Sequence, residues 1–151
     1  MACAKLQEYL DEQRVRYVSM KHSPAFTAQE LAAASHIPGK EVAKTVIVKL
    51  DGVMAMVVLP APEMVRMNHL KAETGADQVE LASEQEFKGR FPDCEVGAMP
   101  PFGNLYEMRT LVQESLTEDE EIAFNAGSHT ELIRMAYADF EELVRPEVLR
   151  G

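Results

Sequence analysis

The sequence predicts an α+β fold, in which helices pack against a mixed β-sheet. Three observations support this class. The chain of 151 residues is long enough for one domain with its own hydrophobic core. An Asp-Gly pair joins two apolar runs, which is typical of a β-hairpin. Helical periodicity and strand-like alternation follow each other without the regular strand–helix repeat of a doubly wound sheet. We therefore expect a single domain over residues 1–151.

The hairpin occupies residues 43–60 and turns at Asp51-Gly52. A type I′ turn requires a positive φ at both central residues, and Asp-Gly is one of the pairs that adopt it. Both strands are apolar on each face, so we expect them in the centre of the sheet. Lys44 stands out at the entrance to this buried pair. A lysine there either extends its ammonium group to water or serves a site.

Two helices and a strand are expected before the hairpin. Leucine and tyrosine recur at helical spacing among charges over residues 3–14, and residues 16–22 alternate like a strand. Ser23-Pro24 ends that strand. Thr27 and Glu30 have the spacing of a capping box, which predicts a second helix that ends near His36.

After the hairpin, Asn68 is expected to cap a short helix that Gly75 closes. Ser83 and Glu86 form a second capping-box signature at the start of another helix. The Gly- and Pro-rich segment 95–105 predicts a loop, and a charged turn is expected at 117–120. Strands are expected at 78–81, 109–112, 122–125 and 130–137, and a last helix at 139–144.

Composition and charge exclude several classes of protein. The net charge is −10, and the excess of acids lies entirely after Gly75, where 17 Asp and Glu oppose 6 Lys and Arg. A general nucleic-acid binder has a basic excess instead, so any contact with nucleic acid must be local. No apolar run approaches the roughly 20 residues that span a bilayer. Cys3 and Cys94 are isolated, which indicates a reducing, cytoplasmic setting.

Familiar catalytic motifs are absent from the sequence. It has no nucleophile elbow, no phosphate-binding loop, no dinucleotide fingerprint and no H-E-x-x-H. Its four histidines are scattered without a helical i, i+4 pair, so no metal site is predicted.

Three features remain as candidates for a site. Lys44 is either a solvated strand-end lysine or a cation that holds an anionic group. The segment 97–103 is either a plain connector or a stiff loop that presents the backbone N–H groups of Ala98 and Met99 to an oxyanion. The segment 125–129 ends a strand in small residues that let a ligand approach the backbone. Ser128 and His129 are adjacent, so they do not form a triad by themselves.

Four stretches together resemble the YbaK-like family of prolyl-tRNA-synthetase-associated domains. They are HSPAFTAQE at 22–30, AKTVIVK at 43–49, VGAMPPFG at 96–103 and EIAFNAGSH at 121–129. The resemblance runs from about Tyr17 onward, and its motifs keep the order of the family. It implies the family's fold, with a mostly antiparallel, barrel-like sheet.

The resemblance also implies an activity, namely hydrolysis of mischarged aminoacyl-tRNA in trans. The expected substrate is tRNA(Pro) carrying a small wrong amino acid such as alanine, bound at its acceptor end. An aminoacyl-tRNA synthetase is a further expected partner, and neither a cofactor nor a membrane is implied. The family's essential lysine matches Lys44, which is therefore the expected catalytic residue. The residues expected to bind substrate are Phe26, Thr45, Gly97, Ala98, Met99, Pro100, Pro101, Gly127, Ser128 and His129.

Two other functions stay open on the sequence. The chain could be a catalytically silent module that binds tRNA or a synthetase. It could also be a regulatory domain that binds a free amino acid or another small metabolite. Deacylation of a mischarged tRNA separates the leading hypothesis from both.

Overall fold

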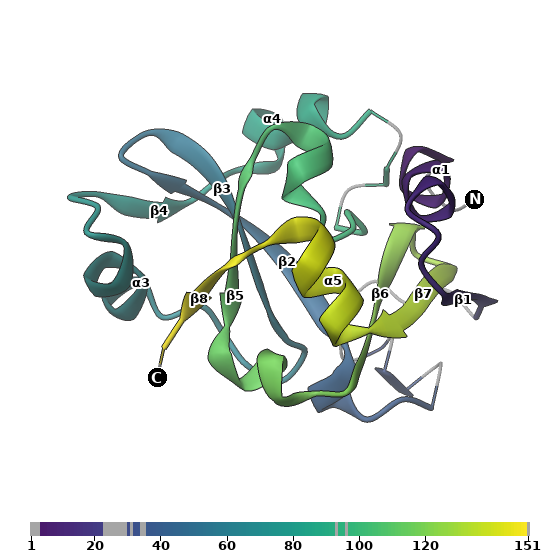
Figure 1. Ribbon diagram of the computed structural model, residues 1–151. Helices are drawn as coiled ribbons and strands as arrows, with labels where there is room; N and C mark the ends of the chain where they lie inside the picture. Colours follow the sequence, from purple (N-terminus) through teal and green to yellow (C-terminus); the bar gives the residue numbers. More distant parts are fainter. Residues whose placement is uncertain are drawn as a thin grey trace.

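The computed structural model describes residues 4–22, 30, 32–33, 36–92, 94–95 and 97–150. Their strands form two sheets, and Figure 1 shows the five-stranded sheet on the left and the three-stranded sheet on the right. The predicted α+β class is confirmed. The strands do not close into one barrel, because each sheet keeps two edge strands.

The smaller sheet is antiparallel and has the order β1-β7-β6. Its strands are β1 (Tyr17–Lys21), β6 (Glu121–Ser128) and β7 (Glu131–Ala136). The register of β6 against β7 shifts between Asn125 and Ser128, which marks a β-bulge. Bulges bend a strand and redirect its side chains, and this one lies where the predicted site segment begins.

The larger sheet is mixed and has the order β4-β2-β3-β5-β8. Asp51 and Gly52 have φ values of 51° and 83°, as the predicted type I′ turn requires. The hairpin that they close lies inside the sheet, as its apolar faces predict. The strands are β2 (Ala43–Leu50), β3 (Val53–Pro60), β4 (Val79–Leu81), β5 (Arg109–Gln113) and β8 (Glu147–Leu149).

In the described part of the chain, four α-helices with assigned bounds and several 3-10 turns cover the sheets. Ser83 and Glu86 form the predicted capping box, with both reciprocal hydrogen bonds present. The predicted helix end at Gly75 is confirmed by its left-handed φ of 73°. The α-helices are α1 (Ala4–Glu12), α3 (Met67–Thr74), α4 (Glu84–Phe87) and α5 (Tyr137–Val144). The 3-10 turns are η1 (Gly39–Glu41), η2 (Lys88–Arg90), η3 (Gly103–Tyr106) and η4 (Glu114–Glu118).

The two sheets meet where β2 begins. Val42 and Ala123 form a parallel bridge, and both are fully buried. A large core, built around Phe102, Phe124 and Phe140, packs between the sheets and the helices. A second core, on the other face of the hairpin, packs under α3. Buried aromatic side chains of this size contribute most of the burial energy of a small core, so the sheets are held firmly relative to each other.

Three local predictions were wrong or fall outside the described residues. The helix α3 begins at Met67 after Arg66, so Asn68 lies in its first turn and does not cap it. The strand β8 was not predicted, because three residues after a proline carry too little periodicity. Most of the helix expected from Thr27 to His36 lies outside the described residues. Among those described, no helix has both the length and the apolarity needed to cross a membrane.

Candidate functional site

The loop before Pro100 is joined by hydrogen bonds to the end of β6. The N–H of Glu95 donates to the carbonyl of Gly127 at 2.7 Å, and the N–H of Gly127 donates to the carbonyl of Ala98 at 3.0 Å. Gly127 has a φ of 98°, which few residues with a side chain adopt. Two predicted site segments, far apart in the sequence, are therefore fixed to each other.

His129 completes this junction. Its backbone N–H donates to the Glu95 carboxylate at 3.0 Å, and the residue is 9% exposed. A Cβ on Gly97 would lie 3.4 Å from His129 Cε1, so the glycine lets the loop backbone approach the imidazole ring closely. We call the group of Glu95, Gly97, Gly127 and His129 the loop–turn junction.

One backbone N–H group of the loop, that of Ala98, differs from the prediction. The N–H of Ala98 donates to the Glu95 carbonyl at 3.0 Å, so it does not face an oxyanion as expected. The N–H of Gly97 points to the thioether sulfur of Met99 at 3.3 Å, a weak acceptor that a substrate could replace. Gly97 is exposed, whereas the four residues Ala98, Met99, Pro100 and Pro101 are buried.

Ser128 is not arranged as a nucleophile. The Ser128 hydroxyl lies 3.4 Å from the hydroxyl of Thr130. It also accepts a long hydrogen bond from the backbone N–H of Thr130. Activation of a serine requires a base within hydrogen-bond reach, and the described contacts of this hydroxyl include none. Within the described part of the chain, no group of three or more potential ligands is placed to hold a metal ion.

Lys44 lies on β2, partly buried. Its ammonium donates to the carbonyl of Ala61 at 3.1 Å. Burial lowers the pKa of Lys44 below its ordinary value, and the negative charge of Glu63 raises this pKa in part. Glu63 is itself held by the hydroxyl of Ser115 at 2.6 Å. Among the described residues, Lys44 is thus neither freely solvated nor in direct ion contact with a carboxylate.

The relation of Lys44 to the junction follows from strand register. Val42 bridges Ala123 in parallel, so Lys44 and Asn125 are each two residues further along the same direction. The junction begins two residues beyond Asn125, across the bulge. Thr45 is partly buried and points to the opposite face of the strand from Lys44. Phe26 lies outside the described residues.

Two further residues of the site were missed by sequence reasoning. Glu95 lies two residues before the glycine of the loop, and that position was its only local signal. No local sequence signal pointed to Glu63, because its effect on the pKa of Lys44 depends on the pairing of β2 with β3.

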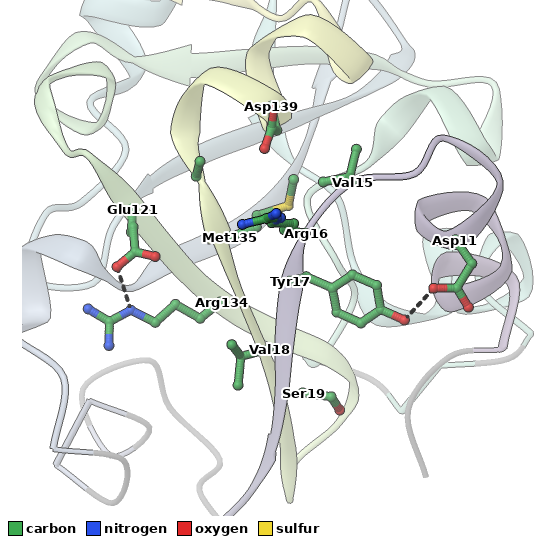
Figure 2. A pocket seen from close by; sticks show the side chains of 11 residues that line it. Asp11, Val15, Arg16, Tyr17, Val18, Ser19, Glu121, Arg134, Met135 and Asp139 are labelled. Atoms are coloured by element: carbon green, nitrogen blue, oxygen red, sulfur yellow. Dashed lines mark hydrogen bonds and ion pairs between the residues drawn. The ribbon is translucent and has the colours of Figure 1, made fainter.

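A large hollow lies elsewhere on the molecule. It has a volume of about 870 Å³ and lies beside β1 and α5, where the hydrogen bond from Tyr17 to Asp11 and the ion pair of Arg134 with Glu121 are drawn in Figure 2. None of the predicted site residues lines it. Its charged groups have mixed signs, so size alone does not make it the site.

Comparison with known families decides the identity of the domain. A family model described as an aminoacyl-tRNA editing domain matches residues 22–143. The chain belongs to this family. The family predicted from the sequence is thereby confirmed. Both strands of the hairpin and the whole loop–turn junction lie inside the matched segment.

Curated relatives agree with this assignment. The multifunctional Ser/Thr-tRNA deacylase ProXp-y of Escherichia coli K12 is 28% identical over 112 residues, which cover 71% of this chain and 66% of that protein. A proline–tRNA ligase of Staphylococcus saprophyticus is 42% identical over 60 residues, which cover 40% of this chain and 11% of the ligase. The chain thus spans just under two thirds of the deacylase, and a 60-residue stretch of it matches a small part of the ligase.

Solved structures share the fold. A hypothetical protein matches with a TM-score of 0.85 and 23% identity, over 95% of this chain and 96% of the other. A candidate trans-editing enzyme for prolyl-tRNA synthetase matches with a TM-score of 0.81 and 17% identity, over 97% and 93% of the two chains. Identities this low establish the architecture of the editing domain alone.

Replacing Glu95 by alanine should loosen the loop–turn junction. The change removes the acceptor of the His129 N–H. A hydrogen bond to a charged group is worth about 1.5–3 kcal/mol, so we expect exchange of this amide to accelerate about tenfold or more. Glu95→Gln retains a carbonyl acceptor and should restore most of the protection. Amide hydrogen exchange followed by NMR measures the rate for the His129 N–H in both variants. Equal exchange in Glu95→Ala and the wild type would contradict the role of Glu95.

Proposed function

We propose that this editing domain hydrolyses the ester between a wrong amino acid and the terminal ribose of tRNA. The loop–turn junction carries the proposal, because it fixes the exposed Gly97 backbone against His129 inside the segment that matches the family. The favoured substrate is tRNA(Pro) carrying alanine. Serine and threonine esters come next, since the E. coli relative is named as a Ser/Thr-tRNA deacylase.

In the proposed reaction, water attacks the ester carbonyl carbon and forms a tetrahedral intermediate. The carbon–oxygen bond to the ribose then breaks, and the products are a free amino acid and the ribose hydroxyl. The N–H of Gly97, whose present acceptor is weak, is a suitable donor to the oxyanion. The Lys44 ammonium supplies a positive charge for the terminal nucleotide or the developing anion.

An aminoacyl ester is already activated, so the domain need only orient the water and stabilise the intermediate. Selection among amino acids would follow from the size of the pocket. One methylene group changes binding by only about 1–3 kcal/mol, and this narrow margin is the reason why errors of charging need a second, hydrolytic check. Docking on a synthetase is part of the proposal, supported by the match to a stretch of proline–tRNA ligase.

A panel of mischarged tRNAs tests the proposal. Purified protein is mixed with tRNA(Pro) that carries alanine, serine or threonine. The same amino acids on their own tRNAs, and Pro-tRNA(Pro), are the correctly charged controls. We expect release of the labelled small amino acid and sparing of proline. Binding without release across the whole panel would instead identify a silent tRNA-binding module. Stabilisation by free amino acids, without tRNA binding, would identify a metabolite-binding domain.

The pH dependence of hydrolysis should reflect the environment of Lys44. Its ammonium is the acid form, so activity that needs the charge falls as the pH rises through its pKa. Because burial lowers this pKa, the fall should occur below the pH at which an exposed lysine titrates, about 10.4. Glu63→Gln removes a charge that favours the ammonium and should move the fall to lower pH. Rates corrected for spontaneous hydrolysis measure the shift.

Ser115→Ala is the matched control for this shift. It removes the hydroxyl that donates to Glu63 but leaves the carboxylate charge near Lys44. The alkaline fall should therefore move less than in Glu63→Gln. An unchanged profile in Glu63→Gln would show that the charge of Lys44 does not limit the rate.

A further inference from the structure

Positive charges from two distant parts of the chain gather at Tyr106. Lys5 of α1 places its ammonium 4.8 Å from the centre of the tyrosine ring. Arg90 donates from its guanidinium to the tyrosine carbonyl at 3.2 Å. Lys88 opens the 3-10 turn that Arg90 ends. We call Lys5, Lys88 and Arg90 the basic cluster.

The platform beneath these cations is rigid. Tyr106 is 7% exposed, and its ring packs on Phe91 with the ring centres 4.5 Å apart. A cation held over an aromatic face keeps a defined position while its charge stays accessible to water. The three cationic residues are all exposed, and Arg90 retains further N–H donors beyond the one used at Tyr106.

The cluster differs from the cations that the fold uses structurally. Lys49, Arg109 and Arg134 each form ion pairs with carboxylates. In the described part of the chain, no member of the basic cluster forms such a pair, although Glu8 and Glu84 lie three and four residues from Lys5 and Lys88. An uncompensated positive group is notable in a protein of net charge −10, where most of the surface repels an anion.

The cluster also borders the loop–turn junction. The Tyr106 hydroxyl lies 3.5 Å from the Cys94 sulfur, and Cys94 is directly followed by Glu95 of the junction. Tyr106 itself ends the 3-10 turn that follows the loop of Gly97. In Figure 1, α1 lies on the same side of the molecule as β6 and β7. A ligand whose end is bound at the junction can therefore reach the cluster.

We propose that the basic cluster binds the phosphate backbone of the RNA whose acceptor end enters the junction. This inference rests on the proposed function, since it assigns the way in which the same substrate is held. Ammonium and guanidinium groups bind phosphate oxygens without reading bases. The cluster therefore provides affinity and orientation for tRNA, while the junction and its surroundings select the amino acid.

The test removes two charges from the cluster and two from elsewhere. Lys5→Gln/Lys88→Gln leaves the Arg90–Tyr106 hydrogen bond intact. Lys71→Gln/Arg150→Gln is the matched control, because it makes the same change in net charge on exposed residues of α3 and the C-terminal end. Both variants are compared with the wild type for thermal stability, which should not differ.

Binding of uncharged tRNA is then measured by fluorescence anisotropy over a series of KCl concentrations. Each lost phosphate contact lowers the slope of log K against log salt by about 0.7–0.9, so the cluster variant should lose about 1.5. Its Kd should rise about tenfold at low salt, and the control should stay within about twofold of the wild type. Equal slopes in the two variants would overturn the proposal, as would tighter binding of poly-glutamate than of tRNA.

Hydrolysis separates this inference from the proposed function. On aminoacyl-tRNA, the cluster variant should show a raised KM and an unchanged kcat. On an aminoacyl-adenosine, which lacks phosphates, it should match the wild type. A wild type that hydrolyses neither substrate would refute the proposed function, and the anisotropy series would still decide whether the cluster binds RNA. A lower kcat on aminoacyl-adenosine would refute the assignment of the cluster to phosphate binding.

Discussion

Replacing Lys44 by alanine should lower the rate of deacylation about a hundredfold or more, since removing one preorganised electrostatic contact to a transition state has effects of this size. The ammonium is held by the Ala61 carbonyl beside Glu63, so its position is fixed before substrate binds. Release of labelled amino acid under single-turnover conditions measures the loss. The thermal midpoint should change little, because the lost hydrogen bond is to a single, partly buried carbonyl.

Two other variants show what Lys44 supplies. Lys44→Arg keeps the charge and should retain part of the activity if charge alone is needed. Lys71→Ala removes an exposed lysine from α3 and should leave the rate unchanged. Full activity of Lys44→Ala at an unchanged thermal midpoint would show that the site operates without this residue.

Replacing Gly97 by alanine should damage the site through geometry. The φ of 86° costs a residue with a side chain about 1–2 kcal/mol, and the new Cβ would lie 3.4 Å from His129 Cε1. The new methyl group would touch the imidazole ring at the limit of van der Waals contact, so a loop that relaxes its backbone strain there also displaces the ring. Misplacement of a reacting group has steep effects on rate, so we expect kcat/KM to fall about tenfold or more.

Gly52→Ala is the matched control for this change. Gly52 has a φ of 83° in the hairpin turn, and a Cβ there meets nothing within 4 Å. Both variants should lose similar stability in thermal unfolding, because the backbone strain is similar. Only Gly97→Ala should also lose deacylation activity. Equal activity of the two variants would mean that the contact with His129 has no part in catalysis.

The sequence predicted which segments lie together better than it predicted the contacts between them. Gly97, Gly127 and His129 were expected to serve one site, and the structure brings their backbones together through Glu95. The expected free N–H of Ala98 is instead used inside the loop. The hydrogen bond from Ala98 to the Glu95 carbonyl depends on how the loop folds back on itself, so no pattern of residue types predicts it. The roles assigned to Lys44 and the loop stay predictions until the variants are measured.

Features set by neighbouring residues were determined by the sequence alone. Asp51-Gly52 defines the hairpin turn because two adjacent residues meet its demand for positive φ. Ser83 and Glu86 define the start of α4 because their hydrogen bonds join residues three apart. In both cases the interacting groups lie within one turn of chain, so the local sequence contains the whole cause.

Features that join distant residues were decided only by the tertiary structure. The strand β8 exists because Leu111 to Gln113 offer it a parallel partner. The environment of Lys44 depends on Ala61 and Glu63, and that of His129 on Glu95 and Gly97. These energies arise from packing and hydrogen bonds between segments tens of residues apart, which no window of sequence contains.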